Sequence, residues 1–431
     1  MLKRIDLRGI TADYASLLPR ATVDVTAAMA EVEPLLESIR EHGTSAITEV
    51  MYRRDGVELN ALRVPGAAIA EARTNQGMDF VDACRVSIDR VRAVHADQVP
   101  LGHQTRVSAG GHVTARHVPV SRVGLYVPGG LAPLASSVIM NAIPAQLAGV
   151  ESIAVASPPQ RETGLPDAKI LAVCAMLGID EVYAVGGPAA IGMFAYGVDE
   201  CRPVDTVSGP GNIYVTAAKR AVRGRVAIDT EAGTTEIAVL ADEHADPGHV
   251  AVDLMSQAEH DPQAASVLIS PSAELLDAVD AELATRIQHT KHSQRMRSAL
   301  TGPQSGAVQV DDLEHGLAVV DAYAAEHLEI QTRNAAELAM RVRNAGAIFV
   351  GPYSPVSLGD YCAGSNHILP TSGCARHSAG LSVHNFLRLI NVVEYSQEAL
   401  REVAEHVRVF AEAEDLPAHG DAVMARWPDA R

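Results

Sequence analysis

Two side chains able to transfer protons, Glu326 and His327, stand next to each other in the segment Asp321-Ala-Tyr-Ala-Ala-Glu-His-Leu-Glu-Ile330. Residues 322–325 favour a helix, and residues 328–332 alternate in the manner of a half-buried strand. The pair therefore falls where a helix gives way to a strand, a position at which α/β proteins often carry catalytic groups. Adjacent residues do not share a helix face, so the two groups could serve different steps. Taken alone, such a dipeptide is more typical of a solvated surface.

A possible metal-binding pair lies upstream. Gln257 and His260 are three residues apart near the end of a helix predicted over residues 247–259. Side chains at this spacing share one helix face and can hold one ion together. The alternative is an ordinary capped helix end.

The polar, glycine-rich stretch 351–367 supplies a further oxygen donor. It follows a strand predicted over residues 347–350 and lies beyond the carboxyl end of that strand, where α/β proteins bind ligands. Asp360 is a candidate metal ligand, although an Asx-turn carboxylate beside Gly359 would look the same. His367 is a candidate substrate contact. Together with Gln257, His260 and possibly His419, Asp360 completes an oxygen and nitrogen set suited to zinc or manganese.

Two glycine-rich turns are candidate cofactor loops. Ser208-Gly-Pro-Gly-Asn212 runs into a predicted helix, and Tyr126 precedes Pro128-Gly-Gly130 at the end of a predicted strand. Bare backbone at a helix N-terminus can accept a diphosphate. The G-x-G-x-x-G fingerprint is absent from both loops, so a standard Rossmann nucleotide mode is not supported.

Composition narrows the class of protein. The 431 residues are 47% hydrophobic and 20% charged, which is typical of a soluble globular chain of more than one domain. The net charge of −18 argues against nucleic acid as a partner. No apolar run approaches the roughly 18 residues that span a bilayer, and the N-terminus is too charged for a signal peptide. The five scattered cysteines argue against disulfides and a thiolate zinc site, so we expect a cytoplasmic protein.

The order of elements indicates the fold. Strands and helices alternate with short connections over residues 123–229 and again over residues 236–350, where the last helix is expected over residues 335–344. This pattern predicts an α/β fold of two tandem, doubly wound, incomplete Rossmann-like parallel-sheet domains. Small helical segments flank them. The N-terminal one includes a helix over residues 24–40 with a kink or break at Pro34, and the chain is expected to be helical after about residue 378.

Several motifs together resemble histidinol dehydrogenases. They occur in order and cover the chain from about residue 20 to His419: Gly124-Leu-Tyr-Val-Pro-Gly-Gly130, Ser208-Gly-Pro-Gly-Asn212, Ser256-Gln-Ala-Glu-His260, Ala325-Glu-His-Leu328, and Gly359-Asp-Tyr361 with Asn366-His367. Separated motifs in register are far more specific than any one of them.

The resemblance implies the reaction and the cofactors. The family oxidises L-histidinol to L-histidine through L-histidinal with two NAD⁺, a four-electron reaction that ends histidine biosynthesis, and holds one zinc per subunit. The implied zinc ligands are Gln257, His260, Asp360 and His419. The last would come from the partner subunit of an intertwined homodimer with shared active sites.

The resemblance also implies residue roles. His327 would take the hydroxyl proton, and Glu326 would activate the water that adds to the aldehyde. Positions that match substrate contacts are Thr235, Gln257, His260, His327, Asp360, His367, Glu414 and His419. Thr235 stands where the family commonly has serine. The NAD positions are Tyr126, Asn212 and Ala189, the last standing where glutamine is usual.

These roles suggest a division of the chain. Residues 1–22 form an N-terminal arm, and residues 121–237 an NAD-associated α/β domain. Residues 23–120 plus 238–378 form a discontinuous α/β domain with the zinc and catalytic residues. Residues 379–431 form a helical tail that docks on the partner subunit.

Two other classes of protein remain open at this point. One is a zinc hydrolase of a small cationic amide or imidazole, in which Glu326 activates a metal-bound water. It would not depend on NAD. The other is a non-catalytic binding protein on the same scaffold.

Overall fold

The computed structural model describes residues 1–11, 13–21, 25–129, 133–230 and 233–427. Asp24 and Gly130, which fall in two of the predicted segments, lie outside these ranges. The chain divides into two compact units, which are described separately: the first comprises Met1–Gln98 and Ser121–Phe386, and the second comprises Val99–Val120 and Leu387–Arg431.

Sheet B of the first unit has five parallel strands in the order β6-β5-β4-β7-β8. Numbered along the chain, this order is 3-2-1-4-5, that of a doubly wound Rossmann-like sheet. Its strands are short and mostly aliphatic, as parallel strands covered on both faces usually are. They are β4 (Arg122–Tyr126), β5 (Ser152–Ser157), β6 (Val182–Ala184), β7 (Thr206–Ser208) and β8 (Ala227–Ile228).

The helices that follow the strands of sheet B are α5 (Ala135–Ala148), α6 (Ala168–Met176), α7 (Gly187–Tyr196) and α8 (Ile213–Val222). Four N-terminal helices precede them: α1 (Val25–His42), α2 (Thr44–Asp55), α3 (Gly66–Thr74) and α4 (Met78–Ala96). Helix α1 packs on α7 and α8, α3 on α6, and α4 on α5. A helix that is apolar all round must be buried, and α5 and α7 are buried along most of their length.

A kink or a break was expected at Pro34, and helix α1 continues through this residue without a break. Val32, Leu36 and Ile39 on this helix are buried in the core of sheet B, and this packing offsets the backbone hydrogen bond that proline removes. The contacts group residues 25–96 with sheet B, whereas the division made from the sequence placed them with the other sheet. That division stays a prediction.

Sheet A of the first unit has six parallel strands in the order β1-β11-β10-β9-β12-β13. Apart from the edge strand β1 the order is again 3-2-1-4-5, so the predicted class, α/β with two doubly wound parallel sheets, is confirmed. The strands are β1 (Lys3–Asp6), β9 (Glu236–Ala241), β10 (Ala265–Ser270), β11 (Gly306–Gln309), β12 (His327–Gln331) and β13 (Ala347–Val350). Strand β1 was not predicted because four residues carry too little pattern.

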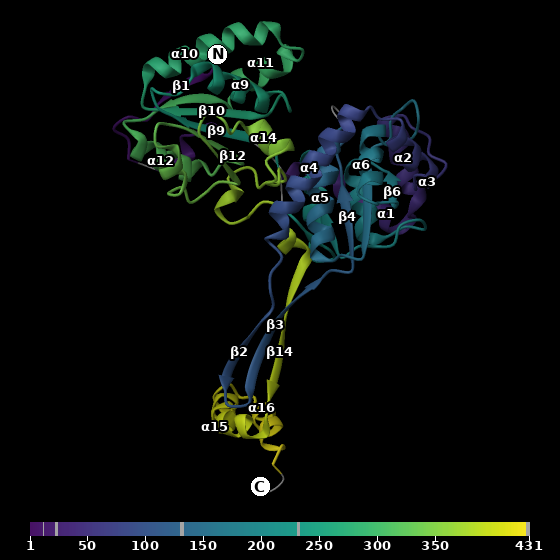
Figure 1. The fold of residues 1–431 in the computed structure, drawn as a ribbon. Helices are drawn as coiled ribbons and strands as arrows, with labels where there is room; N and C mark the ends of the chain where they lie inside the picture. Colours follow the sequence, from purple (N-terminus) through teal and green to yellow (C-terminus); the bar gives the residue numbers. More distant parts are fainter. Residues whose placement is uncertain (12, 22–24, 130–132, 231–232, 428–431) are drawn as a thin grey trace. The chain divides into compact units, whose positions relative to one another are not determined.

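Helices cover both faces of sheet A (Figure 1). One apolar cluster joins the sheet to α9 (Pro247–Ala258), α10 (Ala273–Arg286) and α11 (Ser293–Thr301). Another, on the opposite face, joins it to α12 (Leu313–Tyr323) and α13 (Ala335–Ala339). The remaining helices of this unit are α14 (Val356–Tyr361) and the 3-10 turns η1 (Tyr14–Ser16), η2 (Ile287–His289), η3 (Cys374–Arg376) and η4 (Val383–Phe386).

One prediction in this region was wrong in detail, and one helix was not predicted. Helix α13 ends at Ala339 instead of Asn344, because the Asp321 carboxylate accepts hydrogen bonds from the N–H groups of Arg343 and Asn344 and ties that turn to α12. The glycine-rich, polar stretch 351–367, for which no helix was predicted, contains α14. Helices in glycine-rich sequence depend on tertiary contacts, which sequence patterns do not reveal.

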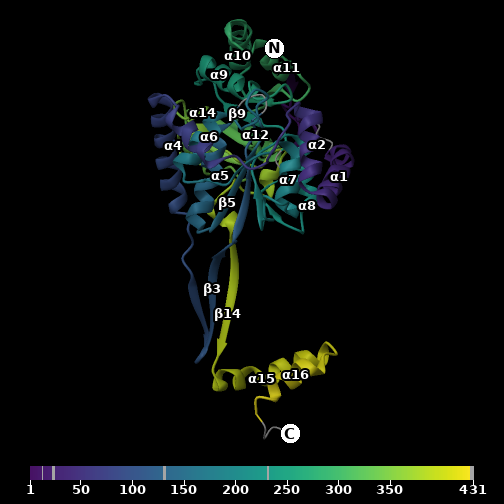
Figure 2. The same cartoon turned by 90° about the vertical axis from the view of Figure 1, so that its right-hand side faces the viewer.

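The second unit has an antiparallel sheet in the order β14-β3-β2, followed by two helices. Its elements are β2 (His103–Ser108), β3 (Gly111–Pro119), β14 (Leu387–Tyr395), α15 (Gln397–Ala413) and α16 (Pro417–Met424). Strands β3 and β14 run side by side in Figures 1 and 2. The prediction that the chain is helical after residue 378 is therefore wrong for β14. This strand is exposed along nearly its whole length and lacks the alternation of a half-buried strand.

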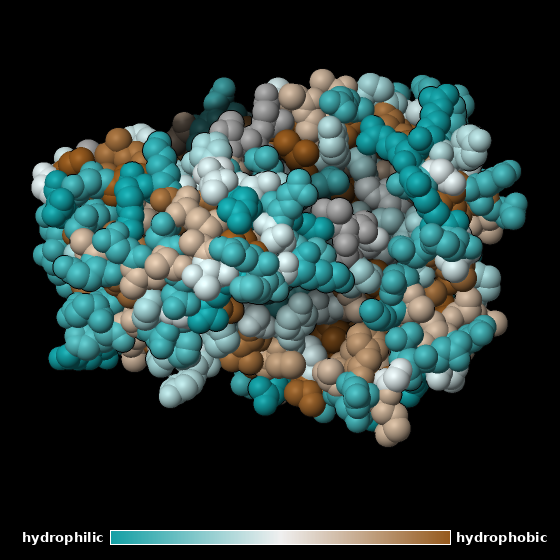
Figure 3. Space-filling model, turned by 90° about the horizontal axis from the view of Figure 1, so that it is seen from above, coloured by the Kyte–Doolittle hydropathy of each residue, from teal (hydrophilic) through white to brown (hydrophobic). Residues whose placement is uncertain are grey.

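Polar side chains cover most of the face shown in Figure 3, and hydrophobic residues lie on it in small groups. Among the described residues, no helix has the length and apolarity required to cross a membrane.

Candidate functional site

Glu326 lies between α12 and β12, and His327 is the first residue of β12, which confirms the predicted change from helix to strand. Ala324 ends the helix in the left-handed conformation with φ 51°, and its N–H donates to the carbonyl of Val320. The chain then enters β12 at His327, which pairs with Ile237 of β9. Glu326 is 6% exposed and His327 is 4% exposed, so the pair is not part of a solvated surface.

The carboxylate of Glu326 is held through one of its oxygens. Oε2 accepts hydrogen bonds from the N–H of Glu236, at 2.9 Å, and from the hydroxyl of Thr235, at 2.5 Å. The same oxygen lies 3.4 Å from Nδ1 of His327. Since these three contacts all involve Oε2, Oε1 is the atom with which Glu326 can act on a reactant.

Thr235 also connects this carboxylate to Gln257 in the last turn of α9. The Gln257 Nε2 group donates to the Thr235 hydroxyl. Its Oε1 atom is buried and has no hydrogen-bond partner among the described residues. A buried carbonyl oxygen without a donor is costly, and a bound cation would satisfy it.

Asp360, on α14, faces two histidines. Its Oδ2 atom lies 3.8 Å from Nε2 of His260, and its Oδ1 atom lies 4.0 Å from Nε2 of His327. These distances are longer than direct hydrogen bonds. The three side chains and Gln257 thus converge with unused donor atoms, an arrangement that suits a cation bound among them.

His367 joins the site from the segment after α14. Its Nδ1 lies 3.0 Å from the main-chain oxygen of Asp360, and its Nε2 lies 3.2 Å from the hydroxyl of Ser137 on α5. With the proton on Nδ1, Nε2 accepts from Ser137.

The charges of the site shift several pKa values. Burial opposes ionisation of Asp360, but His260, His327 and His367 lower its pKa below the usual range. The Asp360 carboxylate raises the pKa of His260. Burial acts against the His327 imidazolium, yet Glu326 and Asp360 prevail and raise its pKa. Burial lowers the pKa of His367, which favours the neutral ring.

The site lies at the amino ends of β9 and β12, although loops at the carboxyl ends are the usual ligand-binding edge of such sheets. Glu326 and Thr235 immediately precede these strands, and α9 and α14 bring Gln257 and Asp360 back to the same edge. The expectation that the stretch 351–367 binds ligands at the carboxyl end of its strand was therefore wrong for Asp360.

The predicted cofactor residues gather at the carboxyl ends of the strands of sheet B. Tyr126 ends β4, and its hydroxyl accepts a hydrogen bond from the N–H of Gly187 at 3.1 Å. Burial raises the pKa of this hydroxyl to about 12. Gly209 packs against the Tyr126 backbone, where a Cβ atom would lie 2.0 Å from the carbonyl oxygen, and its φ of +130° also requires glycine.

Asn212 and Ala189 have different environments. Asn212 caps α8, with its Oδ1 accepting from the N–H groups of Tyr214 and Val215, so its Nδ2 remains as a donor for a ligand. Ala189 is buried in the first turn of α7 and has no polar side-chain atom. Glu414 and His419 belong to the second unit, where Glu414 ends α15 and His419 lies in α16. Their roles stay predictions.

A buried carboxyl group beside the site was not anticipated. The Glu236 side chain is buried behind Glu326, forms an ion pair with Arg20 at 3.3 Å and accepts from the N–H of Gly373 at 3.4 Å. Burial and the charge of Glu326 raise its pKa to about 7, against the effect of Arg20. An acidic residue at the start of the otherwise apolar strand β9 was the available signal.

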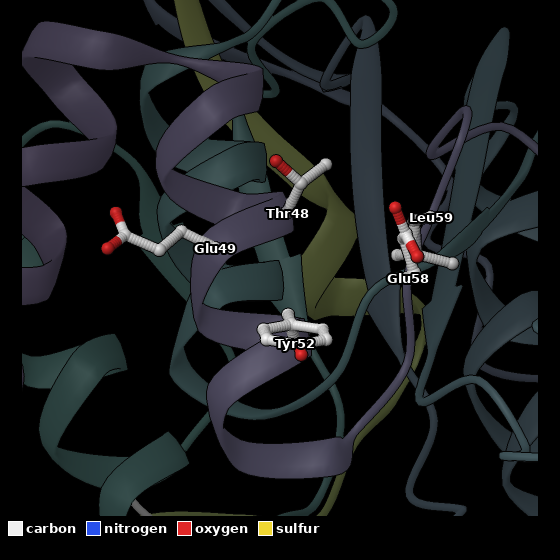
Figure 4. A pocket seen from close by; sticks show the side chains of 5 residues that line it. All are labelled: Thr48, Glu49, Tyr52, Glu58 and Leu59. Carbon is white, nitrogen blue, oxygen red and sulfur yellow. The ribbon is translucent and has the colours of Figure 1, made fainter.

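Two other features of the surface hold none of the predicted site residues. One is an open hollow on α2 and the segment after it, lined by Thr48, Glu49, Tyr52, Glu58 and Leu59 (Figure 4). The other is the acidic cluster of Asp242, Glu243 and His244, whose donor atoms lie within 4.8 Å of one another. Asp242 already accepts from the N–H groups of His244 and Arg333, and the other two residues are exposed.

The fold and the site define a class: an α/β enzyme on two Rossmann-like sheets, with a buried acid–base pair beside oxygen and nitrogen donors. A family model of histidinol dehydrogenases matches residues 18–427. The histidinol dehydrogenase of Thermobifida fusca is 59% identical over 429 residues, covering 99% of this chain and 98% of the relative. That of Mycobacterium tuberculosis is 56% identical over 436 residues with the same coverage.

The crystal structure of histidinol dehydrogenase from Elizabethkingia anophelis superposes with a TM-score of 0.93 at 31% identity, covering 99% of this chain and 98% of that one. The chain belongs to the histidinol dehydrogenase family, as the sequence resemblance indicated.

Proposed function

We propose that the protein is a histidinol dehydrogenase that oxidises L-histidinol to L-histidine through L-histidinal, with NAD and one zinc per subunit, in the cytoplasm. The observation that carries this proposal is the buried Glu326–His327 pair facing Asp360. Two bases of different type at one place suit a reaction that removes protons in two separate oxidations.

The donor set fits zinc. Gln257 offers an unpartnered buried oxygen, Asp360 is held ionised, and His260 offers an imidazole nitrogen. Zinc accepts both nitrogen and oxygen ligands. When bound, zinc would hold the substrate's imidazole and amine, and NAD⁺ would accept the hydride.

His327 is the base of the first oxidation. Its Nδ1 faces the Glu326 carboxylate, so a proton kept on Nδ1 leaves Nε2 as the basic atom on the side of Asp360. Nε2 takes the substrate's hydroxyl proton as the hydride leaves the same carbon. The raised pKa of His327 makes the ring a stronger proton acceptor.

Glu326 is the base of the second oxidation. Its Oε2 is held by Thr235 and by the N–H of Glu236, which orients Oε1. Oε1 takes a proton from the water that adds to the aldehyde carbon, and the resulting hydrate then loses the second hydride. Burial of the carboxylate keeps other water away from this position.

The proposal includes a homodimer in which His419 and Glu414 complete the partner's site. The second unit exposes large apolar side chains, among them Leu389 (59%), Val393 (66%) and Phe410 (70%). Exposed apolar patches of this kind support a protein interface. A second copy of the chain would cover them and bring a tail to the other subunit.

The test is NADH formation from L-histidinol and NAD⁺ by zinc-loaded protein, with metal-stripped protein as the control. Two NADH for each histidine formed are expected. Zinc-loaded protein that forms no NADH overturns the proposal. Release of ammonia or another hydrolysis product without NAD would point to the zinc hydrolase class instead.

A further inference from the structure

Two carboxyl groups lie buried together beneath the donor set. Glu329 is in the middle of β12 and is 0% exposed, and Asp253 on α9 is 8% exposed. A hydrogen bond between the two side chains contributes to the pKa of each. Neither residue belongs to the catalytic or metal set described above.

A single proton between them explains how this pair can be buried. Ionised carboxylates only accept hydrogen bonds, and Glu329 Oε2 is a buried atom without a donor in the described part of the chain. Burial and the Asp253 charge raise the pKa of Glu329 well above its usual value, against the effect of the Val356 N–H and of Gln331. A proton on Glu329 would turn two repelling acceptors into a donor and an acceptor.

The pair touches all three elements that bring the donor set together. The other oxygen of Glu329 accepts from the N–H of Val356, the first residue of α14, at 2.9 Å, and Asp360 lies one turn further along this helix. Glu329 and His327 are two residues apart on β12 and share a face of the strand. Asp253 precedes Gln257 by four residues on α9, which places both on one helix face.

We propose that Glu329 and Asp253 are a positioning pair that holds α9, β12 and α14 in the register the zinc site requires. This inference rests on the proposed function. The pair touches neither substrate nor cofactor and acts through Gln257, Asp360 and His327. Removing either side chain should therefore lower the zinc affinity more than it lowers the stability of the metal-free protein.

Zinc affinity, measured by competition with a chelating dye, tests the pair in the full-length protein. Asp253→Ala and Glu329→Ala should lower the affinity about 10- to 100-fold, as loss of residues that support metal ligands usually does. Glu329→Gln should stay within about threefold of the parent, because its amide nitrogen can donate to Asp253 and its oxygen can accept from Val356. Val252→Ala, at an exposed neighbouring position on α9, is the matched control.

Thermal unfolding of the metal-free variants separates positioning from stability. A lower melting temperature with unchanged zinc affinity in Asp253→Ala would overturn the inference, as would equal losses in Glu329→Gln and Glu329→Ala. If Glu329→Ala does not fold, the comparison of Asp253→Ala with Asp253→Asn decides, since asparagine can still donate to Glu329.

The same measurements keep the inference distinct from the proposed function. Parent protein that binds zinc with the expected pattern of variants but forms no NADH refutes only the reaction. Parent protein that forms NADH, together with Asp253→Ala of normal zinc affinity, refutes only the positioning pair. Parent protein that does not bind zinc refutes both.

Discussion

At the scale of single residues, Thr235 connects the two kinds of chemistry in the site. Its hydroxyl donates to Glu326 and accepts from Gln257, so one oxygen lies between the proposed water-activating base and the candidate metal ligands. Oε1 of Glu326 and Oε1 of Gln257, the atoms left to act on a reactant or a cation, are thereby fixed relative to each other. Separate roles for Glu326 and His327 depend on this fixed geometry.

Glu326→Gln should impair the oxidation of histidinal more than that of histidinol. The amide oxygen can still accept from Thr235 and Glu236, but the side chain can no longer take a proton. We expect the second oxidation to slow by a factor of about 100 to 10,000, the usual contribution of a general base. Single-turnover rates with each substrate measure this difference. Equal losses in both oxidations would contradict separate roles, and Glu337→Gln on the exposed side of α13 is the control.

Glu236→Gln should change how stability depends on pH. The pKa of Glu236 is raised from 4.5 to about 7 in the folded protein, so its contribution is fully present below pH 4.5 and is lost as the pH rises through 7. The shift corresponds to about 3 kcal/mol. The stability of the glutamine variant relative to the parent should therefore rise by about this amount as the pH increases from 4.5 to 8. Urea unfolding across this range measures it, and a difference that does not vary with pH would contradict the assignment.

At the scale of elements, the two sheets use opposite ends. Sheet A presents its candidate catalytic residues at the amino ends of β9 and β12, and sheet B presents its candidate cofactor loops at the carboxyl ends of β4 and β7. The contact between His367 and Ser137 of α5 joins these two edges. The same strand order therefore supports two different kinds of site.

The loop after β7 rests on a buried ion pair. Lys219 of α8 forms an ion pair with Asp229. The Lys219 ammonium group also donates to the carbonyl of Gly209 at 3.1 Å, and the Asp229 carboxylate accepts from the N–H of Gly209 at 2.8 Å. Both side chains are almost fully buried. The conformation of the candidate cofactor loop thus depends on residues that a ligand would not touch.

Lys219→Met should destabilise the protein by about 3–5 kcal/mol, because it leaves the Asp229 carboxylate buried without its partner. Adding Asp229→Asn should recover part of the loss, since asparagine removes the charge and still accepts from Gly209. Urea unfolding of the two variants and NAD titration measure the effects. A double variant no more stable than the single one would argue against the ion pair as the cause.

Sequence patterns predicted the elements whose burial shows in the pattern itself. Both parallel sheets were found because their strands are aliphatic runs with short connections. Strand β14 was not predicted because its surface is exposed, and helix α14 was not predicted because its sequence is rich in glycine and polar residues. The family motifs indicated Glu326, His327, Gln257, His260 and Asp360. They did not indicate Glu236, Glu329 or Asp253, whose partners lie far away in the sequence.

At the scale of the whole molecule, the proposed exchange of tails predicts complementation between two inactive variants. One chain carries His419→Asn and the other His327→Asn. In a mixed dimer one site would combine an intact His327 with the partner's intact His419, and the other would have neither. Such dimers should regain about half of the parent activity, as the two-fold symmetry of the dimer requires.

Mixed dimers purified through two different affinity tags allow this measurement. Each variant alone should be nearly inactive, and simple mixing without exchange is the control. No recovery in a verified mixed dimer would mean that His419 acts within its own chain.

The edge strand β1 has a consequence for the synthesis of the chain. Lys3 pairs with Gly306, so β1 cannot join its sheet until β11, which comes much later in the chain, has been made. Residues 122–228 of sheet B are complete long before that, and domains fold as they emerge. Nascent chains stalled before Gly306 should therefore resist protease over sheet B while residues 1–11 are cut. Protection of both regions in such chains would contradict this order, in which β1 joins its sheet only after sheet B has been made.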